Sequence, residues 1–231
     1  MKYFYLYIFL LAIFIIGVSY YNTFLSSPIN KEGFYNSNNN NNNNKSIVLL
    51  GDSILKNNTY TSNGKGIDDL LKERNNGNVY CYAEDYSKIT DVYSQINNIP
   101  PELNNQNTSI FLSSGGNDLL TYYDDRGGNL DDTTVLNPMF SGYKKVVKNI
   151  NTKFPNSKLV LLDIYYPDNT RFQAYHPIIS KWNQMLYNYA NKNQNNVLRV
   201  SSMLTNPDDF SFGIEPSSLG GEKIANSILY Y

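Results

Sequence analysis

The sequence is poor in the residues that build metal sites, disulfides and basic surfaces. Its 231 residues include one cysteine, Cys81, and one histidine, His176. A single cysteine excludes an intrachain disulfide, and without a cluster of histidine and cysteine we expect neither a bound metal nor another cofactor. The formal net charge is −1, whereas nucleic-acid-binding domains usually carry a basic patch, so we expect no nucleic-acid partner.

Charge is also missing from residues 3–21, a run of nineteen residues rich in Phe, Leu, Ile and Tyr. At about 1.5 Å per residue, a helix of this length nearly spans the hydrocarbon core of a bilayer. Because positive charge precedes the run at Lys2, we predict that residues 1–21 form a transmembrane anchor with the rest of the chain lumenal or extracellular. The alternative is a signal peptide cleaved after the small residues of Gly17-Val18-Ser19, which would leave the protein secreted.

Residues 22–45 have the composition of a linker. Eight of the nine residues from Asn36 to Asn44 are asparagine. Such a tract has no apolar face to bury, so we predict that it is disordered and acts as a tether. Residues 46–231 remain, which is enough for one well-buried domain.

Strand-like and helix-like segments alternate along residues 46–231. Short apolar runs predict five strands, at 47–50, 79–83, 110–113, 159–164 and 197–200. Apolar residues at helical spacing occur between them and after the last, and a polar loop is expected at residues 121–134. Alternation of this kind predicts a parallel sheet with helices on both faces. The expected fold is therefore a three-layer, doubly wound, flavodoxin-like α/β sandwich.

Two of the predicted strands end in the same way, with a glycine followed by polar side chains. The first leads into Gly51-Asp52-Ser53 and the third into Gly115-Gly116-Asn117-Asp118. If these strands are adjacent and parallel, Ser53 and Asn117 lie at the same edge of the sheet, where ligands bind in open α/β folds. A serine there is a candidate nucleophile, and an asparagine amide is a donor that an oxyanion hole can use.

These two motifs resemble the first and third blocks of the SGNH/GDSL hydrolase family, and the resemblance extends over about residues 46–231. The family's blocks read Gly-Asp-Ser and Gly-x-Asn-Asp. The resemblance implies an ester hydrolase in which Ser53 attacks the substrate and Asn117 helps to hold the oxyanion. The other residues of the two blocks are expected to contact the substrate: Asp52, Gly115, Gly116 and Asp118.

The sequence departs from the family pattern at two further blocks. Where the family's second block offers a glycine N–H to the oxyanion hole, the best-placed residue is Tyr86, which still has a backbone N–H. Where the last block reads Asp-x-x-His, this chain has Phe212 and Glu215. A serine needs an adjacent base, and the position implies that Glu215 takes that role if burial raises its pKa above the usual 4.3 or so.

The only histidine offers an alternative base. His176 follows the fourth predicted strand, in a loop that also leaves the carboxyl edge of the sheet, although a surface or packing role is the simpler interpretation. Asp163 or Asp168 could orient it. In the same way, Asp208 or Asp209 could orient Glu215.

Two functional hypotheses follow. The first is a membrane-tethered serine esterase or acetylesterase that acts on acyl or acetyl esters of glycans or lipids, with Ser53, Glu215, Asn117 and Tyr86 as the catalytic groups. The second is a catalytically inactive module of the same fold that binds a glycan or a partner, because both the Asp and the His of the last block are missing.

Overall fold

The structure is a computed structural model that describes residues 45–125 and 132–231. The predicted membrane segment at residues 1–21 lies outside the described residues, as does the predicted linker up to residue 44. Within the part that the structure describes, no helix is both long and apolar enough to cross a bilayer.

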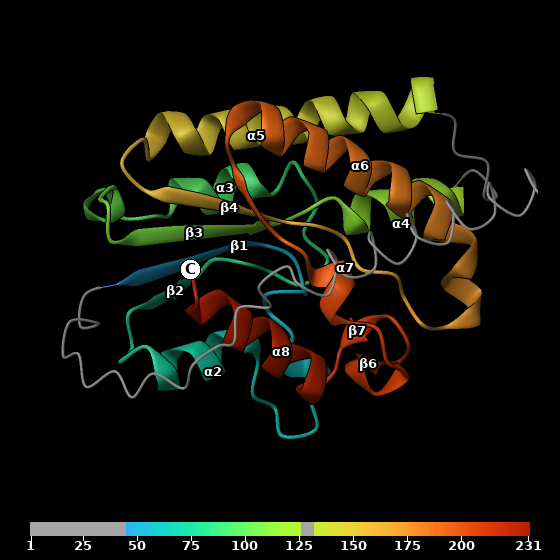
Figure 1. Cartoon of the computed structure of the whole chain (residues 1–231), viewed down its shortest axis with the longest axis horizontal. Coiled ribbons are helices and arrows are strands. Elements are labelled where there is room, and N and C mark those ends of the chain that lie inside the picture. The colour runs from blue at the N-terminus through green and yellow to red at the C-terminus, as the bar shows by residue number, and fades with distance from the viewer. Residues whose placement is uncertain (1–44, 126–131) are drawn as a thin grey trace, which may run out of the picture. The chain divides into compact units, whose positions relative to one another are not determined.

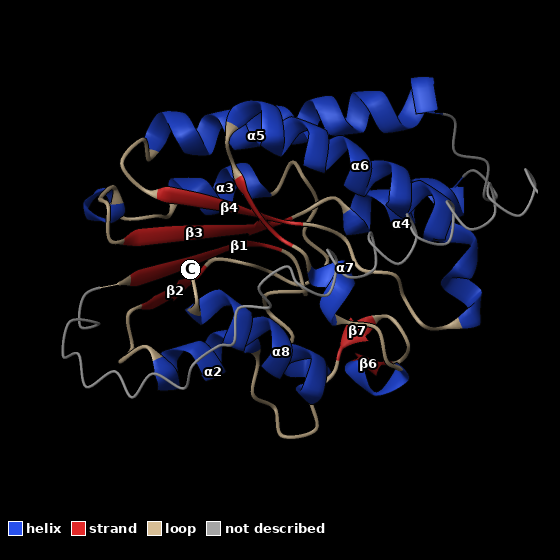
Figure 2. Cartoon of the chain, in the orientation of Figure 1, coloured by secondary structure: helices blue, strands red, loops and turns tan. Residues whose placement is uncertain are grey.

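Five parallel strands form the central sheet, in the order β2-β1-β3-β4-β5 (Figures 1 and 2). In chain order they are β1 (Ser46–Gly51), β2 (Val79–Cys81), β3 (Thr108–Ser113), β4 (Lys158–Leu162) and β5 (Asn196–Leu198). The five-stranded parallel sheet confirms the prediction from the alternating pattern. β1 and β3 are neighbours, and their ends meet with Gly51 opposite Ser113.

Helices cover both faces of the sheet and give three layers (Figure 2). The larger core lies under α3 (Val92–Asn97), α5 (Asn137–Lys153) and α6 (His176–Asn193). The smaller core lies under α2 (Ile67–Arg74) and α8 (Ser218–Leu229). Alternate residues of β1 enter the two cores, with Val48 and Leu50 in the larger and Ile47 and Leu49 in the smaller. Burial on both faces explains why this strand reads as a continuous apolar run.

Several boundaries differ from the sequence prediction. Helix α4 (Gly116–Asp125) extends into residues 121–125, where a polar loop was predicted, because Leu119 packs in the larger core and continues the helical spacing. Residues 132–136 form a helical turn, while 126–131 lie outside the described residues. The fifth strand ends at Leu198, and Val200 begins the short helix α7 (Val200–Met203).

A small hairpin was not predicted from the sequence. It pairs β6 (Phe210–Ser211) with β7 (Glu215–Pro216) in antiparallel fashion and follows a 3-10 turn at Pro207–Asp209. Strands of two residues are too short to show a hydrophobic period. The hairpin nevertheless carries Glu215.

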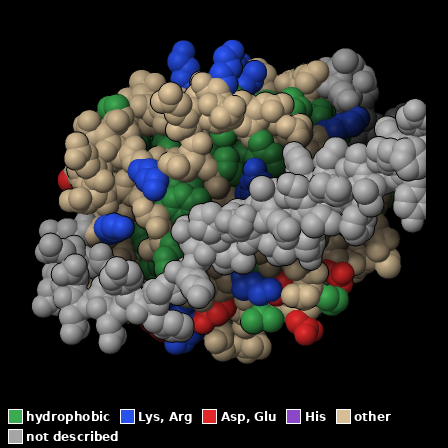
Figure 3. Space-filling model, viewed as in Figure 1, with side chains coloured by type: hydrophobic (Ala, Val, Ile, Leu, Met, Phe, Trp, Pro, Cys, Tyr) green, Lys and Arg blue, Asp and Glu red, His purple; other side chains and the backbone are tan. Residues whose placement is uncertain are grey.

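Surface charge is unevenly distributed over the domain. Helices α5 and α6 contain six lysines and no aspartate or glutamate. In Figure 3, lysine and arginine side chains line the edge where α5 lies, and acidic side chains gather towards the side of α8. Lysine and arginine side chains pair with the carboxylates on the side of α2 and α8, so that side is mixed in charge, whereas α5 and α6 carry only positive side chains.

The contact between β1 and β3 leaves no space for a side chain at Gly51. Its φ is +119°, and a Cβ placed there would lie 1.5 Å from the Ser113 carbonyl oxygen. We expect Gly51→Ala to lower the free energy of unfolding by more than about 4 kcal/mol, because the two strands would have to separate. Urea unfolding followed by circular dichroism measures this loss.

Gly142→Ala is the matched control. Gly142 lies inside α5, and its Cβ would make an ordinary contact 3.7 Å from Ile89. This substitution should raise stability by about 0.5–1 kcal/mol, since alanine favours a helix interior. Equal unfolding midpoints for the two variants would contradict the proposed constraint at Gly51.

Candidate active site

Ser53 lies in a buried turn directly after β1, and the Gln95 side chain fixes the start of that turn. The Gly51 N–H donates to Gln95 Oε1 over 2.7 Å, and Gln95 Nε2 donates to the Gly51 carbonyl over 2.9 Å and to Ser87 Oγ over 3.0 Å. Ser53 is only 6% exposed, and no acceptor among the described residues is bonded to its N–H. The serine therefore presents both a hydroxyl and a backbone donor at the sheet edge.

Asp52 is a buried carboxylic acid beside this serine. Its Oδ1 accepts hydrogen bonds from Ser113 Oγ at 2.7 Å and from the Ile54 N–H at 3.3 Å. Burial raises the pKa of Asp52 to about 7, against the two hydrogen bonds, and the nearby charge of Glu215 adds to the rise. Asp52 thus carries a proton over much of the acidic and neutral range.

Glu215 meets Ser53 across the pocket, although 162 positions separate them in the chain. Both side chains line the pocket, but the described part of the chain contains no hydrogen bond between the Ser53 hydroxyl and the Glu215 carboxylate. Burial raises the pKa of Glu215, and the charge of Asp85 raises it further, while the nearby Ser53 hydroxyl lowers it by less. Its Oε2 is buried and has no hydrogen-bond partner in the described part of the chain. The structure therefore brings together the serine and the carboxylate that the sequence analysis paired.

Distant residues hold the backbone on either side of Glu215. The Tyr165 hydroxyl donates to the Ile214 carbonyl, and Asn57 Nδ2 donates to the Pro216 carbonyl at 3.1 Å. At the tip of the hairpin, the Asn169 N–H donates to the Gly213 carbonyl at 3.1 Å. These bonds come from two loops, the one after β1 and the one after β4, so the position of Glu215 depends on both sides of the carboxyl edge of the sheet.

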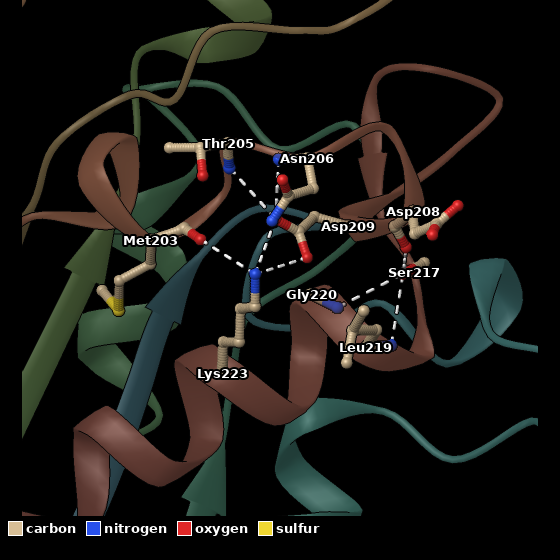
Figure 4. Close-up of polar contacts among 9 residues, drawn as sticks. All are labelled: Met203, Thr205, Asn206, Asp208, Asp209, Ser217, Leu219, Gly220 and Lys223. Carbon is tan, nitrogen blue, oxygen red and sulfur yellow. Dashed lines mark hydrogen bonds and ion pairs between the residues drawn. The ribbon is translucent and has the colours of Figure 1, made fainter.

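The stem of the hairpin is fixed by Asp209, as Figure 4 shows. Asp209 is fully buried, and its Oδ2 accepts from the Thr205 and Asn206 N–H groups, each at 3.0 Å, and from Lys223 Nζ at 2.8 Å. Its carbonyl accepts from the Ser217 N–H at 2.9 Å. The Asp209 carboxylate is therefore bonded to backbone and to Lys223, and it supports the segment that carries Glu215.

Asp208 helps to hold the hairpin through its backbone carbonyl and not through its carboxylate. Its carbonyl accepts from Ser217 Oγ at 2.6 Å, and the same oxygen of Ser217 caps α8 by accepting from the Leu219 and Gly220 N–H groups, each at 3.2 Å (Figure 4). A serine at this position ends the hairpin and begins the last helix.

The third sequence block lies at the start of α4, where Gly116 and Asn117 line the pocket with Ser53. One amide hydrogen of Asn117 is bonded to the Ser87 carbonyl at 3.0 Å, which leaves its second amide hydrogen for a ligand. Asp118 points elsewhere and accepts from the Ile89 N–H at 3.0 Å. Gly115 has φ +112°, and a Cβ there would come within 2.4 Å of the Trp182 ring. Gly115 and Asp118 are thus placed to hold the backbone around the pocket.

Tyr86 has a glycine-like backbone conformation. Its φ is +60°, its side chain is 75% exposed, and its N–H donates to Asp85 Oδ1 at 3.0 Å. It is not among the residues that line the pocket. A role in an oxyanion hole would require the Tyr86 N–H to give up its bond to Asp85.

His176 is the first residue of α6, where a loop was predicted. Its Nε2 lies 2.9 Å from the Pro167 carbonyl oxygen, and its ring packs edge-on against Tyr166. It lines a separate hollow together with Asp168. Asp163 is engaged elsewhere, by the Tyr187 hydroxyl and by both polar groups of Ser201. The structure therefore does not bring the imidazole into the Ser53 pocket.

The pocket itself is small, with a volume of about 50 Å³. Asp52, Ser53, Asn117 and Glu215 form its polar end. Its other walls come from α4, from the segment after β4, from the start of α6 and from Ile214. Sequence analysis missed the residues of these walls and the bonds from Gln95 to the Gly51 backbone, because neither feature has a local sequence motif.

The raised pKa of Asp52 should make the free energy of unfolding depend on pH. The folded-state pKa is about 7 and the usual value is 3.8, so the folded state holds the extra proton between these pH values. Stability contributed by Asp52 is therefore full at low pH and falls as pH rises, by up to about 1.4 kcal/mol per pH unit in that window.

Asp52→Asn removes this titration while keeping the acceptor for Ser113. We expect the variant to gain stability relative to the natural protein as pH rises from 4.5 to 7.5, measured by urea unfolding at each pH. A constant difference in unfolding free energy across that range would show that Asp52 is ionised throughout.

No family model and no curated protein sequence matches the chain. Solved structures do match. A member of the lipolytic G-D-S-L family from Veillonella parvula DSM 2008 has a TM-score of 0.60 at 21% identity, covering 81% of this chain and 97% of that chain. A GDSL-like lipase from Bacteroides thetaiotaomicron VPI-5482 has a TM-score of 0.60 at 13% identity, covering 80% and 86%.

A catalytic mutant of an acetylxylan esterase from Geobacillus stearothermophilus gives a TM-score of 0.58 at 13% identity, covering 81% of this chain and 95% of that chain. These identities are low, and the likeness is one of architecture over the whole domain. The polar ends of β1 and β3 and the shared architecture lead to one conclusion: the chain has an SGNH/GDSL hydrolase-like fold.

Proposed function

We propose that this protein is a serine ester hydrolase that uses Glu215 as its base. The observation that carries the proposal is that Ser53 and the partly buried Glu215 carboxylate line the same pocket. The structural neighbours include GDSL lipases and acetylxylan esterases, which supports ester hydrolysis as the reaction class.

In the first step, Ser53 Oγ attacks the carbonyl carbon of the ester while Glu215 takes the hydroxyl proton. The oxyanion accepts hydrogen bonds from the Ser53 N–H and from the second amide hydrogen of Asn117. When the tetrahedral intermediate collapses, the alcohol leaves with the proton held by Glu215, and the acyl group stays on Ser53. Water then attacks the acyl-enzyme with Glu215 again as base, which releases the acid and restores the serine.

Burial allows a carboxylate to take the place of an imidazole. A glutamate in water is a weak base, but the apolar surroundings raise the pKa of Glu215 towards the working pH. Its Oε2 is buried and has no hydrogen-bond donor in the described residues, so no protein donor there competes with the serine for the negative charge. The nearby Asp52 is kept protonated by burial and adds little negative charge in the acidic and neutral range.

Three substitutions test the assignment of the base. We expect Ser53→Ala to abolish turnover of p-nitrophenyl acetate and Glu215→Gln to lower kcat by about 10²–10⁴-fold, because the serine loses its proton acceptor. His176→Ala should leave kcat within twofold of the natural protein, since the imidazole is bonded outside the pocket. The purified full-length chain is compared with each variant.

The pH profile adds a second readout. A base must be ionised, so activity should fall on the acid side of the raised pKa of Glu215, and His176→Ala should not move that limb. If His176→Ala loses activity and Glu215→Gln does not, the assignment of Glu215 as the base is wrong. If the natural protein and Ser53→Ala are equally inert on several ester classes, the inactive binding module, suggested by the missing Asp and His of the last block, becomes the better explanation.

We also propose that residues 1–21 hold the protein at a membrane, with the esterase domain lumenal or extracellular and residues 22–45 as its tether. The support is the run of nineteen uncharged residues at 3–21. Amino-terminal sequencing of the mature protein should start at residue 1 or 2, and the chain should stay in the membrane pellet after a high-salt wash. A variant lacking residues 3–21 is the control and should be released, while a mature terminus near Tyr20 would show cleavage instead.

A further inference from the structure

Positive charge is concentrated on helices α5 and α6. The two helices contain six lysines and no aspartate or glutamate over 17 and 18 residues, and lysine and arginine side chains line the edge where α5 lies (Figure 3). Lysines of α2 and α8 pair with aspartates, but Lys144, Lys145 and Lys148 of α5 form no ion pair with any described residue. All three are exposed. Charge of one sign that gathers without partners attracts the opposite sign, so this face favours an anionic ligand.

The three lysines surround an open hollow between the two helices, which lie side by side over the larger core (Figure 1). This α5–α6 hollow has a volume of about 570 Å³ and receives Lys144, Lys145 and Lys148 from one side. Tyr189 of α6 forms the opposite wall, with its ring edge-on against Phe140 of α5. The lysines lie within four residues of each other, or about 6 Å along the helix axis. Ammonium groups this close repel one another, and a ligand with several negative groups relieves that repulsion.

The rest of the lining consists of neutral groups that form hydrogen bonds. Ser141, Asn151 and Thr152 lie in the same stripe of α5 as the lysines, and Asn193 faces them from α6. The stripe from Ser141 to Thr152 is about 16 Å long. Hydroxyl and amide groups both donate and accept, as sugar hydroxyls do. The hollow therefore suits a linear ligand that combines negative groups with hydroxyls.

Two other kinds of polyanion fit this surface less well. Helices that bind a lipid surface bury apolar side chains in it, but no exposed large hydrophobic side chain lies on α5 or α6. Single-stranded nucleic acids stack their bases on aromatic rings. Tyr189 is the one aromatic residue that lines the hollow in the described chain, and its ring packs against Phe140.

We infer that the α5–α6 hollow binds an anionic glycan, a linear polysaccharide that carries carboxylate or sulfate groups. Lys144, Lys145 and Lys148 pair with the acidic groups, and Asn151 and Asn193 bond to the sugar hydroxyls. The hollow shares no lining residue with the Ser53 pocket. The inference therefore goes beyond the proposed function and does not rest on it.

Calorimetric titration of the full-length chain, kept in a neutral detergent, tests the inference with heparin and with polygalacturonate. We expect both to bind, with an affinity that falls as salt is added because screening weakens the ion pairs. Dextran, which has sugar hydroxyls but no charge, should not bind detectably. If neither anionic glycan binds at low salt, the inference is wrong.

A matched pair of double variants locates the binding. Lys144→Gln with Lys148→Gln removes two lysines that line the hollow, whereas Lys65→Gln with Lys192→Gln removes two exposed lysines that do not. The first pair should weaken heparin binding by about tenfold and the second by less than about threefold, although the change in net charge is the same. Arginine at positions 144 and 148 should restore binding, since it keeps the charge. Equal losses in the two double variants would contradict the assigned site.

A third set of measurements separates a glycan site from a general anionic surface. Asn151→Ala removes an amide without changing the charge, so it should weaken heparin binding by about threefold and leave the salt dependence unchanged. A single-stranded oligonucleotide and vesicles of phosphatidylglycerol are the competing polyanions and should bind more weakly than heparin. If either binds as tightly and loses the same affinity in the Lys144 and Lys148 double variant, the hollow does not select glycans and the inference fails.

Discussion

The site depends on how closely the carboxyl ends of β1 and β3 approach each other. At Gly51 a single methyl group would collide with the Ser113 carbonyl oxygen. Because the strands are this close, Ser113 can donate to Asp52, and the turn that carries Ser53 leaves the sheet beside Asn117. Gln95 ties the same point to Ser87, whose carbonyl in turn accepts from Asn117. The nucleophile and the oxyanion donor are thus positioned by one contact between two strands.

Burial gives the two carboxylates of the site different chemistry. Asp52 has hydrogen-bond donors from Ser113 and Ile54 and is held as a neutral acid up to a pH of about 7. Glu215 lines the same pocket as Ser53 and keeps one buried oxygen without a partner in the described residues. In our proposal this difference in environment lets one carboxylate act as base beside the serine while its neighbour stays protonated.

Glu215 reaches the serine only because residues far from it in the chain fix its hairpin. Asp209 bonds the stem to Lys223 of the last helix, Asn57 bonds Pro216, and Tyr165 bonds Ile214. None of these contacts follows from the local pattern of residues 210–216, which form two strands of two residues each. Sequence could propose Glu215 only by its place before the last helix.

The sequence alone determined the parallel sheet and the two polar strand ends, because continuous apolar runs that stop at glycine are local features with a direct structural meaning. It therefore identified Ser53 and Asn117 as neighbours. Tertiary structure decided which base meets the serine. Glu215 and His176 both follow segments that end at the same edge, and only the folded chain shows that the imidazole binds Pro167 while the carboxylate meets Ser53. The shape and polarity of the pocket were likewise invisible in the sequence, since its lining residues come from five separate segments that packing brings together.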